Sequence, residues 1–302
     1  MIAQTLGIIG AQGLLTLGDA ATSVLFIGAS ILVSISFGPI LLSATPVPAT
    51  EVAPAMSMRK LFAGSPLGTV GIFLLGGVYA TQSGMGAVFG SQIGLSAAQI
   101  ALFVAMLFAG ALVFQYPIGW LSDRMDRRKL IFGAAVLGAV SCALGWVTGG
   151  GLWFLMVSAF FAGGMTTPLY ALFLAYTNDS LRAEDMPGAS GGLVFTFGLG
   201  AILGPLVTGW AMQGLGPFAF WLVLGATFGI IAFYALYRMT QRASTPSEET
   251  ESYLGVLPTA SPVAVEAAAT WSAELAELDR DTATQPPSPE VTTDSQRNVQ
   301  LR

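Results

Sequence analysis

The chain has 302 residues, of which 54% are hydrophobic and only 10% are charged. An ordinary soluble domain carries about 25% charged residues, so this composition excludes one. The net charge of −5 divides unevenly: residues 1–243 have nine basic and seven acidic residues, and residues 244–302 have three basic and ten acidic. The acidity therefore belongs to a tail, and no basic surface indicates a nucleic-acid partner.

Long uncharged runs set the predicted fold class. No charge occurs in 61–122, 130–178 or 186–237, and residues 1–43 contain only Asp19. A membrane-spanning helix needs about 20 apolar residues, so each of these four segments has room for two spans. We predict an all-α integral membrane helical bundle with about eight spans, at residues 1–18, 20–43, 67–90, 98–121, 130–148, 152–176, 188–212 and 217–237.

Two segments interrupt the apolar pattern. Residues 44–65 contain prolines and polar residues and predict a cytoplasmic linker. Residues 241–302 are rich in Ser, Thr, Pro and Glu and predict a disordered acidic cytoplasmic tail. The predicted division is thus two spans in 1–43, the linker, a six-helix bundle in 66–240 and the tail.

The basic residues predict the topology. One uncharged hairpin separates each basic group from the next, so all groups lie on the same side of the membrane. By the positive-inside rule that side is the cytoplasm. The opposite turns contain no Lys or Arg. The groups are Arg59 with Lys60, the run 124–129, Arg182, and Arg238 with Arg242.

Two further compositional features bear on function. Cys142 is the only cysteine and histidine is absent, so we expect neither a disulfide nor a metal site, and no cofactor. Glycines cluster at 7–13, 160–164 and 198–209. Small residues let membrane helices approach closely, which fits either plain packing or helices that move against one another.

The most concentrated charge is in "GWLSDRMDRRK", residues 119–129, with six charges between Asp123 and Lys129. One interpretation is a topological anchor, which would explain the bases. It would not explain Gly119 one turn before the aspartate, nor the second acid, Asp126. The other interpretation is a latch, in which an aspartate binds the N-terminus of a neighbouring helix, worth about 0.3–2 kcal/mol.

This stretch resembles the cytoplasmic loop signature of the major facilitator superfamily: Gly, then four residues later Asp-Arg, then Arg-Arg or Arg-Lys. "GLGAILGPLVTG", at 198–209, is similar to the superfamily's glycine–proline pattern. Asp126 stands where the family usually has glycine, which puts the sharp turn there in question. The resemblance covers most of 1–240 and is closest to a bacterial branch of poorly characterised carriers.

The resemblance implies an origin for the eight spans. Superfamily members have twelve helices in two halves, with the signature after helices two and eight, so residues 1–240 correspond to helices five to twelve. We therefore expect the C-terminal portion of a carrier of the bacterial inner membrane, and expect these 302 residues not to transport alone. The implied gate motif comprises Gly119, Asp123, Arg124, Arg127 and Arg128.

The resemblance also implies that residues 67–90 and 152–176 line a central cavity for a small organic solute. On the first span, Tyr79, Gln82, Ser83 and Gly86 form a polar stripe at helical spacing. On the second, Thr166, Thr167 and Tyr170 surround Pro168. Polar side chains in spans face protein or a water-filled cavity, so these residues either contact solute or join helices by hydrogen bonds.

No Asp, Glu, Lys or Arg lies inside a predicted span, so nothing indicates a strongly charged solute. A carboxylate for proton coupling would belong to the missing half.

Alternative functions remain open at this point. An eight-span channel or scaffold is one, although no rings of charged ligands are visible. A non-transporting membrane fragment is another. A membrane enzyme would have only Asn178–Asp179 and Glu184–Asp185 as candidate catalytic groups. They lie in a short turn that we interpret as a solvated loop, so no enzyme is expected.

Overall fold

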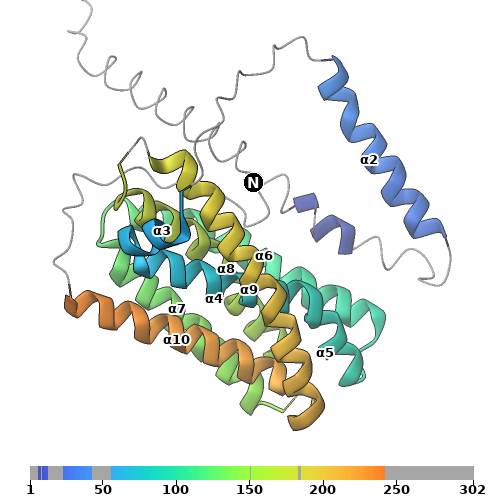
Figure 1. The fold of residues 1–302 in the computed structure, drawn as a ribbon. Coiled ribbons are helices and arrows are strands. Elements are labelled where there is room, and N and C mark those ends of the chain that lie inside the picture. The colour runs from blue at the N-terminus through green and yellow to red at the C-terminus, as the bar shows by residue number, and fades with distance from the viewer. Residues whose placement is uncertain are drawn as a thin grey trace, which may run out of the picture. The chain divides into compact units, whose positions relative to one another are not determined.

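The computed structural model describes residues 6–7, 9–12, 23–42, 56–149, 151–182 and 185–241. Every regular element in these residues is a helix (Figure 1). In chain order they are α2 (Val24–Leu42), α3 (Met58–Gly64), α4 (Pro66–Ala80), the π-helical turn η1 (Thr81–Met85), α5 (Gly86–Gln92), α6 (Ala97–Ser122), α7 (Arg127–Val147), α8 (Leu152–Asn178), α9 (Met186–Leu215) and α10 (Ala219–Gln241).

Within the described residues, six helices are long and apolar enough to cross a membrane. They are the continuous α4–η1–α5 helix and α6 to α10, and they match the six spans predicted from residue 67 onward. The predicted all-α membrane bundle is confirmed. The other two predicted spans are not among the six: residues 1–18 lie largely outside the described part, and the apolar stretch of α2, Phe26–Gly38, is shorter.

The end of the predicted linker is helical. Met58–Gly64 forms α3, and the Ser57 side chain accepts a hydrogen bond from the N–H of Lys60 at 3.3 Å. Such a cap satisfies an N–H group that has no partner inside the helix. Pro66 then begins α4, where a missing N–H costs nothing. Residues 44–55 and the tail from 242 on lie outside the described residues, so the predicted domain division stays a prediction.

Helix α8 lies at the centre of the bundle. It packs against α4, α6 and α7, while α4 pairs with α9 and α7 with α10. Figure 1 shows α7 and α10 running alongside each other. In the most apolar stretch of α8, 67% of the residues are buried, and in that of α9 only 28% are buried. Side chains of α8 therefore meet protein on nearly every side, and α9 offers one face to lipid or to further helices.

Glycines allow backbone-to-backbone contact at two helix pairs. A Cβ on Gly110 of α6 would overlap the carbonyl oxygen of Phe160 in α8. One on Gly200 of α9 would overlap the carbonyl oxygen of Phe73 in α4. A backbone contact cannot be relieved by turning a side chain. The glycine clusters at 160–164 and 198–209 thus contribute to close packing, which both interpretations of the sequence require.

Gly200→Ala is expected to lower stability, and Gly198→Ala, two residues away, is the matched control. The added methyl at 200 overpacks the α4–α9 contact, at a cost of about 1–3 kcal/mol. Nothing lies within 4 Å of a Cβ at 198, and alanine favours helix over glycine by about 1 kcal/mol. Thermal unfolding of both purified variants in detergent measures the difference. Equal midpoints would contradict the backbone contact.

Candidate functional site

A π-helical turn interrupts the span from Pro66 to Gln92. α4 ends at Ala80 and η1 occupies the next five residues. The π turn is a rare geometry, found mostly as single turns inside α-helices and frequently at functional sites. Two adjacent residues of the turn, Thr81 and Gln82, are buried and bind two different helices.

Gln82 is joined to α8 by a hydrogen bond. The Thr166 hydroxyl lies 2.9 Å from Oε1 of Gln82 and 3.0 Å from the carbonyl oxygen of Ala162, and it can donate its single hydrogen to either oxygen. Gln82 is 5% exposed and Thr166 is 1% exposed. Among the described residues, Nε2 of Gln82 has no hydrogen-bond partner. An unpaired amide in an apolar interior is unfavourable, so this nitrogen marks a place where another polar group would be stabilised.

Thr81 reaches the opposite neighbour, α9. Its hydroxyl lies 3.2 Å from that of Thr208, which in turn donates to the carbonyl of Gly204 at 2.9 Å. The two hydroxyl groups therefore find their hydrogen-bond partners in each other and in the Gly204 carbonyl. This pair is therefore a hydrogen-bond contact between helices, of the kind that joins membrane spans.

A small cavity adjoins the Gln82 amide. The centre of a water molecule can occupy about 10 Å³ of this cavity. The total empty volume, with the open mouth included, is about 260 Å³. The part open to water has room for roughly one water or one polar group. The structure thus brings five of the six predicted cavity residues around one hollow. Its walls are Tyr79, Gln82, Ser83, Leu107, Phe108, Gly163, Thr166 and Thr167.

The sixth predicted residue, Tyr170, lies in an aromatic cluster and not in the cavity wall. Its ring centroid is 5.4 Å from that of Phe197 in α9, and the Tyr79 ring is 5.8 Å from the same phenylalanine. Tyr170 is 2% exposed. Such tilted and edge-on ring contacts are favourable. In this structure Tyr170 therefore supports, through Phe197, the ring of Tyr79 that does line the cavity.

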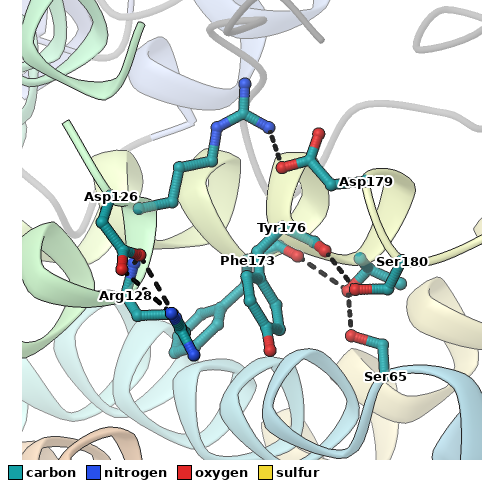
Figure 2. A network of polar contacts seen from close by, with 9 residues as sticks. Ser65, Asp126, Arg128, Phe173, Tyr176, Asp179 and Ser180 are labelled. Carbon is teal, nitrogen blue, oxygen red and sulfur yellow. Dashed lines mark hydrogen bonds and ion pairs between the residues drawn. The ribbon is translucent and has the colours of Figure 1, made fainter. Parts of the chain in front are cut away.

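The charged turn joins α6 to α7 without a glycine. Asp123 follows α6, and its N–H donates to the carbonyl of Gly119 at 3.3 Å. Asp126 caps α7: its Oδ1 accepts from the N–H of Arg128 at 2.9 Å, and its Oδ2 lies 3.0 Å from the guanidinium of Arg128 (Figure 2). The φ angle of Asp126 is −56°, outside the left-handed region that favours glycine. The presence of Asp126 where the family usually has glycine therefore does not disrupt the turn.

Arg127 forms a buried ion pair with Asp179 at the end of α8. Their nearest nitrogen and oxygen lie 2.6 Å apart, and the side chains are only 2% and 7% exposed. The prediction of a solvated loop is wrong for Asp179, because its side chain is buried. Its pairing with an arginine compensates the burial of its charge. The two residues are 52 positions apart. No local sequence pattern connects them, so sequence reasoning missed the pair.

Other polar contacts lie near this ion pair. Ser65 donates to the Thr177 hydroxyl at 3.3 Å, and Thr177 donates to the carbonyl of Phe173 at 2.8 Å. Figure 2 shows these contacts close to Asp179. An exposed ion pair, Lys60 with Asp185 at 2.6 Å, joins α3 to the residue before α9.

The guanidinium of Arg124, in the turn after α6, folds back on that helix. Its central carbon lies 4.1 Å from the ring centroid of Trp120, and its Nη1 donates to the Trp120 carbonyl at 3.0 Å. A cation over an indole face is attractive. The gate-motif residues are therefore distributed over several contacts, and Asp126 and Asp179 are partners that the predicted motif did not include.

Asp179→Asn is expected to destabilise the protein far more than Asp185→Asn. Removing one charge of a buried pair leaves the other uncompensated, at a cost of about 3–5 kcal/mol. The Lys60–Asp185 pair is exposed, with side chains 58% and 20% accessible, and such pairs contribute about 0–1 kcal/mol. Chemical unfolding in detergent compares the variants. Similar losses for both would contradict the burial of Arg127 and Asp179.

Ser83→Cys is expected to react with a charged, water-soluble thiol reagent in membranes, whereas Val140→Cys is not. Ser83 is exposed and lines the cavity, while Val140 is 59% exposed on α7, where lipid would surround it. The native Cys142 is fully buried, so the background is low. Mass spectrometry measures the labelled fraction. Equal labelling of the two cysteines would contradict an aqueous cavity at Ser83.

The sequence also matches a known protein family and several of its members. The profile of the major facilitator superfamily matches residues 67–277. YfkF, an uncharacterized MFS-type transporter of Bacillus subtilis, is 30% identical over 127 residues, which are 42% of this chain and 32% of the relative. An uncharacterized MFS-type transporter of Yersinia enterocolitica is 24% identical over 204 residues, 66% of this chain and 50% of the relative.

A third relative has the same kind of name and coverage. YcaD of Escherichia fergusonii, also an uncharacterized MFS-type transporter, is 23% identical over 201 residues, 65% of this chain and 49% of its own length. The chain thus spans about half, or less, of the length of the curated relatives that it matches.

Proposed function

The chain belongs to the major facilitator superfamily, and we propose that it is the C-terminal portion of a carrier that moves a small organic solute by alternating access. It is a multi-pass membrane protein, with six apolar spans in its described residues. We place it in the bacterial inner membrane, with the charged turn and the tail in the cytoplasm. The basic residues around the turn support this orientation.

The observation that carries the proposal is the cavity at Gln82. In alternating-access carriers the solute binds near the middle of the bilayer, between two bundles. Gln82 lies near the middle of the Pro66–Gln92 span and Thr166 near the middle of α8. A mostly apolar hollow at this depth, beside an amide nitrogen that lacks a partner among the described residues, is suited to bind part of a solute.

The charged turn supplies the proposed latch. Arg127 and Arg128 bind Asp179 and Asp126 and so hold the turn on its own bundle. Asp123 is exposed at the end of α6. From there its carboxylate can accept hydrogen bonds from a helix N-terminus of the other bundle when the cytoplasmic side closes.

Asp123→Asn is expected to shift the complete carrier toward its cytoplasm-open state. A charge at a helix terminus contributes about 0.3–2 kcal/mol, so the shift in equilibrium should be about 2- to 30-fold. The measurement is the labelling rate of Ser83→Cys in the complete protein, from each side of oriented membrane vesicles. Labelling from the cytoplasmic side should rise, and labelling from the other side should fall.

Asp185→Asn is the control for this experiment, because Asp185 is also an aspartate near the end of a helix, where it pairs with Lys60, but it lies outside the gate motif. It should leave both rates unchanged. If Asp123→Asn also leaves them unchanged, the turn is only a topological anchor and the alternating-access proposal loses its gate.

A further inference from the structure

We propose that the cavity at Gln82 recognises an uncharged hydrogen-bonding group of the solute, such as a carboxamide or hydroxyl attached to an apolar body. This inference rests on the proposed function, because it concerns the same cavity. It adds the chemical class of the group that is bound, and it names Gln82 as the residue that selects it and Thr166 as the residue that positions Gln82.

The Gln82 side chain lines the cavity, and one end of its amide lacks a hydrogen-bond partner among the described residues. Thr166 has a single hydroxyl hydrogen, which it donates to Oε1 of Gln82 or to the carbonyl of Ala162. With Oε1 held against Thr166, Nε2 has no partner among the described residues. A half-turn of the amide would place Nε2 on Thr166 and leave Oε1 without that donor. One buried end of the amide therefore lacks a hydrogen bond in either orientation, and a polar group that reaches it would be stabilised.

The cavity wall has no charge to balance an ion. Its eight residues include no Asp, Glu, Lys, Arg or His. The buried ion pair of Arg127 with Asp179 lies away from these residues, at the ends of α7 and α8. Placing an unpaired charge in such a site is strongly unfavourable, whereas a neutral polar group needs only a hydrogen bond. The part of the solute that enters here is therefore uncharged.

The size and lining of the cavity describe the rest of the ligand. About 10 Å³ is open to the centre of a water molecule, which admits one small group and not a whole organic molecule. Tyr79, Leu107 and Phe108 line the same hollow. An apolar or aromatic body at the mouth would pack against these side chains, while its polar group reaches Gln82.

The test uses three probes of nearly the same shape: benzamide, benzoate and benzamidinium. The full chain is reconstituted in lipid nanodiscs, with empty discs as the blank, and binding is followed by ligand-observed NMR titration. We expect benzamide to bind at least about tenfold more tightly than either ion, because only the ions bring an uncompensated charge. Equal affinities, tighter binding of an ion, or no binding of benzamide would each overturn the inference.

Variants assign the preference to Gln82. Gln82→Glu should reverse the order of benzamide and benzamidinium, because the carboxylate can pair with the cation. Thr81→Val is the matched control: it alters the adjacent buried residue, which binds α9, and should keep the preference for benzamide. A preference unchanged by Gln82→Glu would place the bound probe elsewhere and overturn the assignment.

The role of Thr166 has its own readout. Thr166→Val should reduce the preference for benzamide, and Thr166→Ser, which retains the hydroxyl, should restore it. Failure of serine to restore it would show that Thr166 acts only through packing.

The gating experiment remains a separate test: a shift in Ser83→Cys labelling without a benzamide preference overturns this inference alone. A benzamide preference without the shift leaves an amide-binding cavity and removes the transport role.

Discussion

The absence of a hydrophobic driving force between helices in lipid is the constraint on which this bundle depends. Lipid chains are as apolar as leucine, so apolar spans associate through close packing and hydrogen bonds. Gly110 and Gly200 meet carbonyl oxygens of neighbouring helices directly. These contacts fix α6 against α8 and α9 against α4, and so determine where the walls of the cavity lie. The hollow beside Gln82 thus depends on backbone contacts between helices, including that of Gly163 with Leu107, which both line it.

Polar groups are sorted along the spans by the cost of burying them. Charges occur at helix ends, where Arg127 and Asp179 compensate each other. Near the middle of the spans the polar contacts described above are neutral, such as Thr166 with Gln82. The ion pair joins two helices of one bundle and needs no rearrangement when that bundle tilts as a unit. In the proposed carrier a solute, by contrast, must bind and leave, and weak neutral hydrogen bonds suit that requirement.

Much of this arrangement could be predicted from the sequence, because membrane burial restricts charge so strongly. The uncharged runs predicted six spans that the structure contains, and polar residues in apolar spans indicated five residues of the cavity wall. Contacts between distant residues could not be predicted. The Arg127–Asp179 pair depends on how two helix ends meet. The position of Tyr170 depends on Phe197, which belongs to a third helix.

The π turn explains why a polar stripe inferred from helical spacing has the wrong extent. Tyr79, Gln82, Ser83 and Gly86 would lie on one face of an unbroken α-helix, but η1 falls between the first and the last of them. The extra width of a π turn rotates the residues after it relative to the residues before it. Gly86 accordingly packs near Phe103 of α6, 3.4 Å from where its Cβ would be, and it does not line the cavity. The turn that contains the buried Gln82 amide therefore also separates Gly86 from the residues that line the cavity.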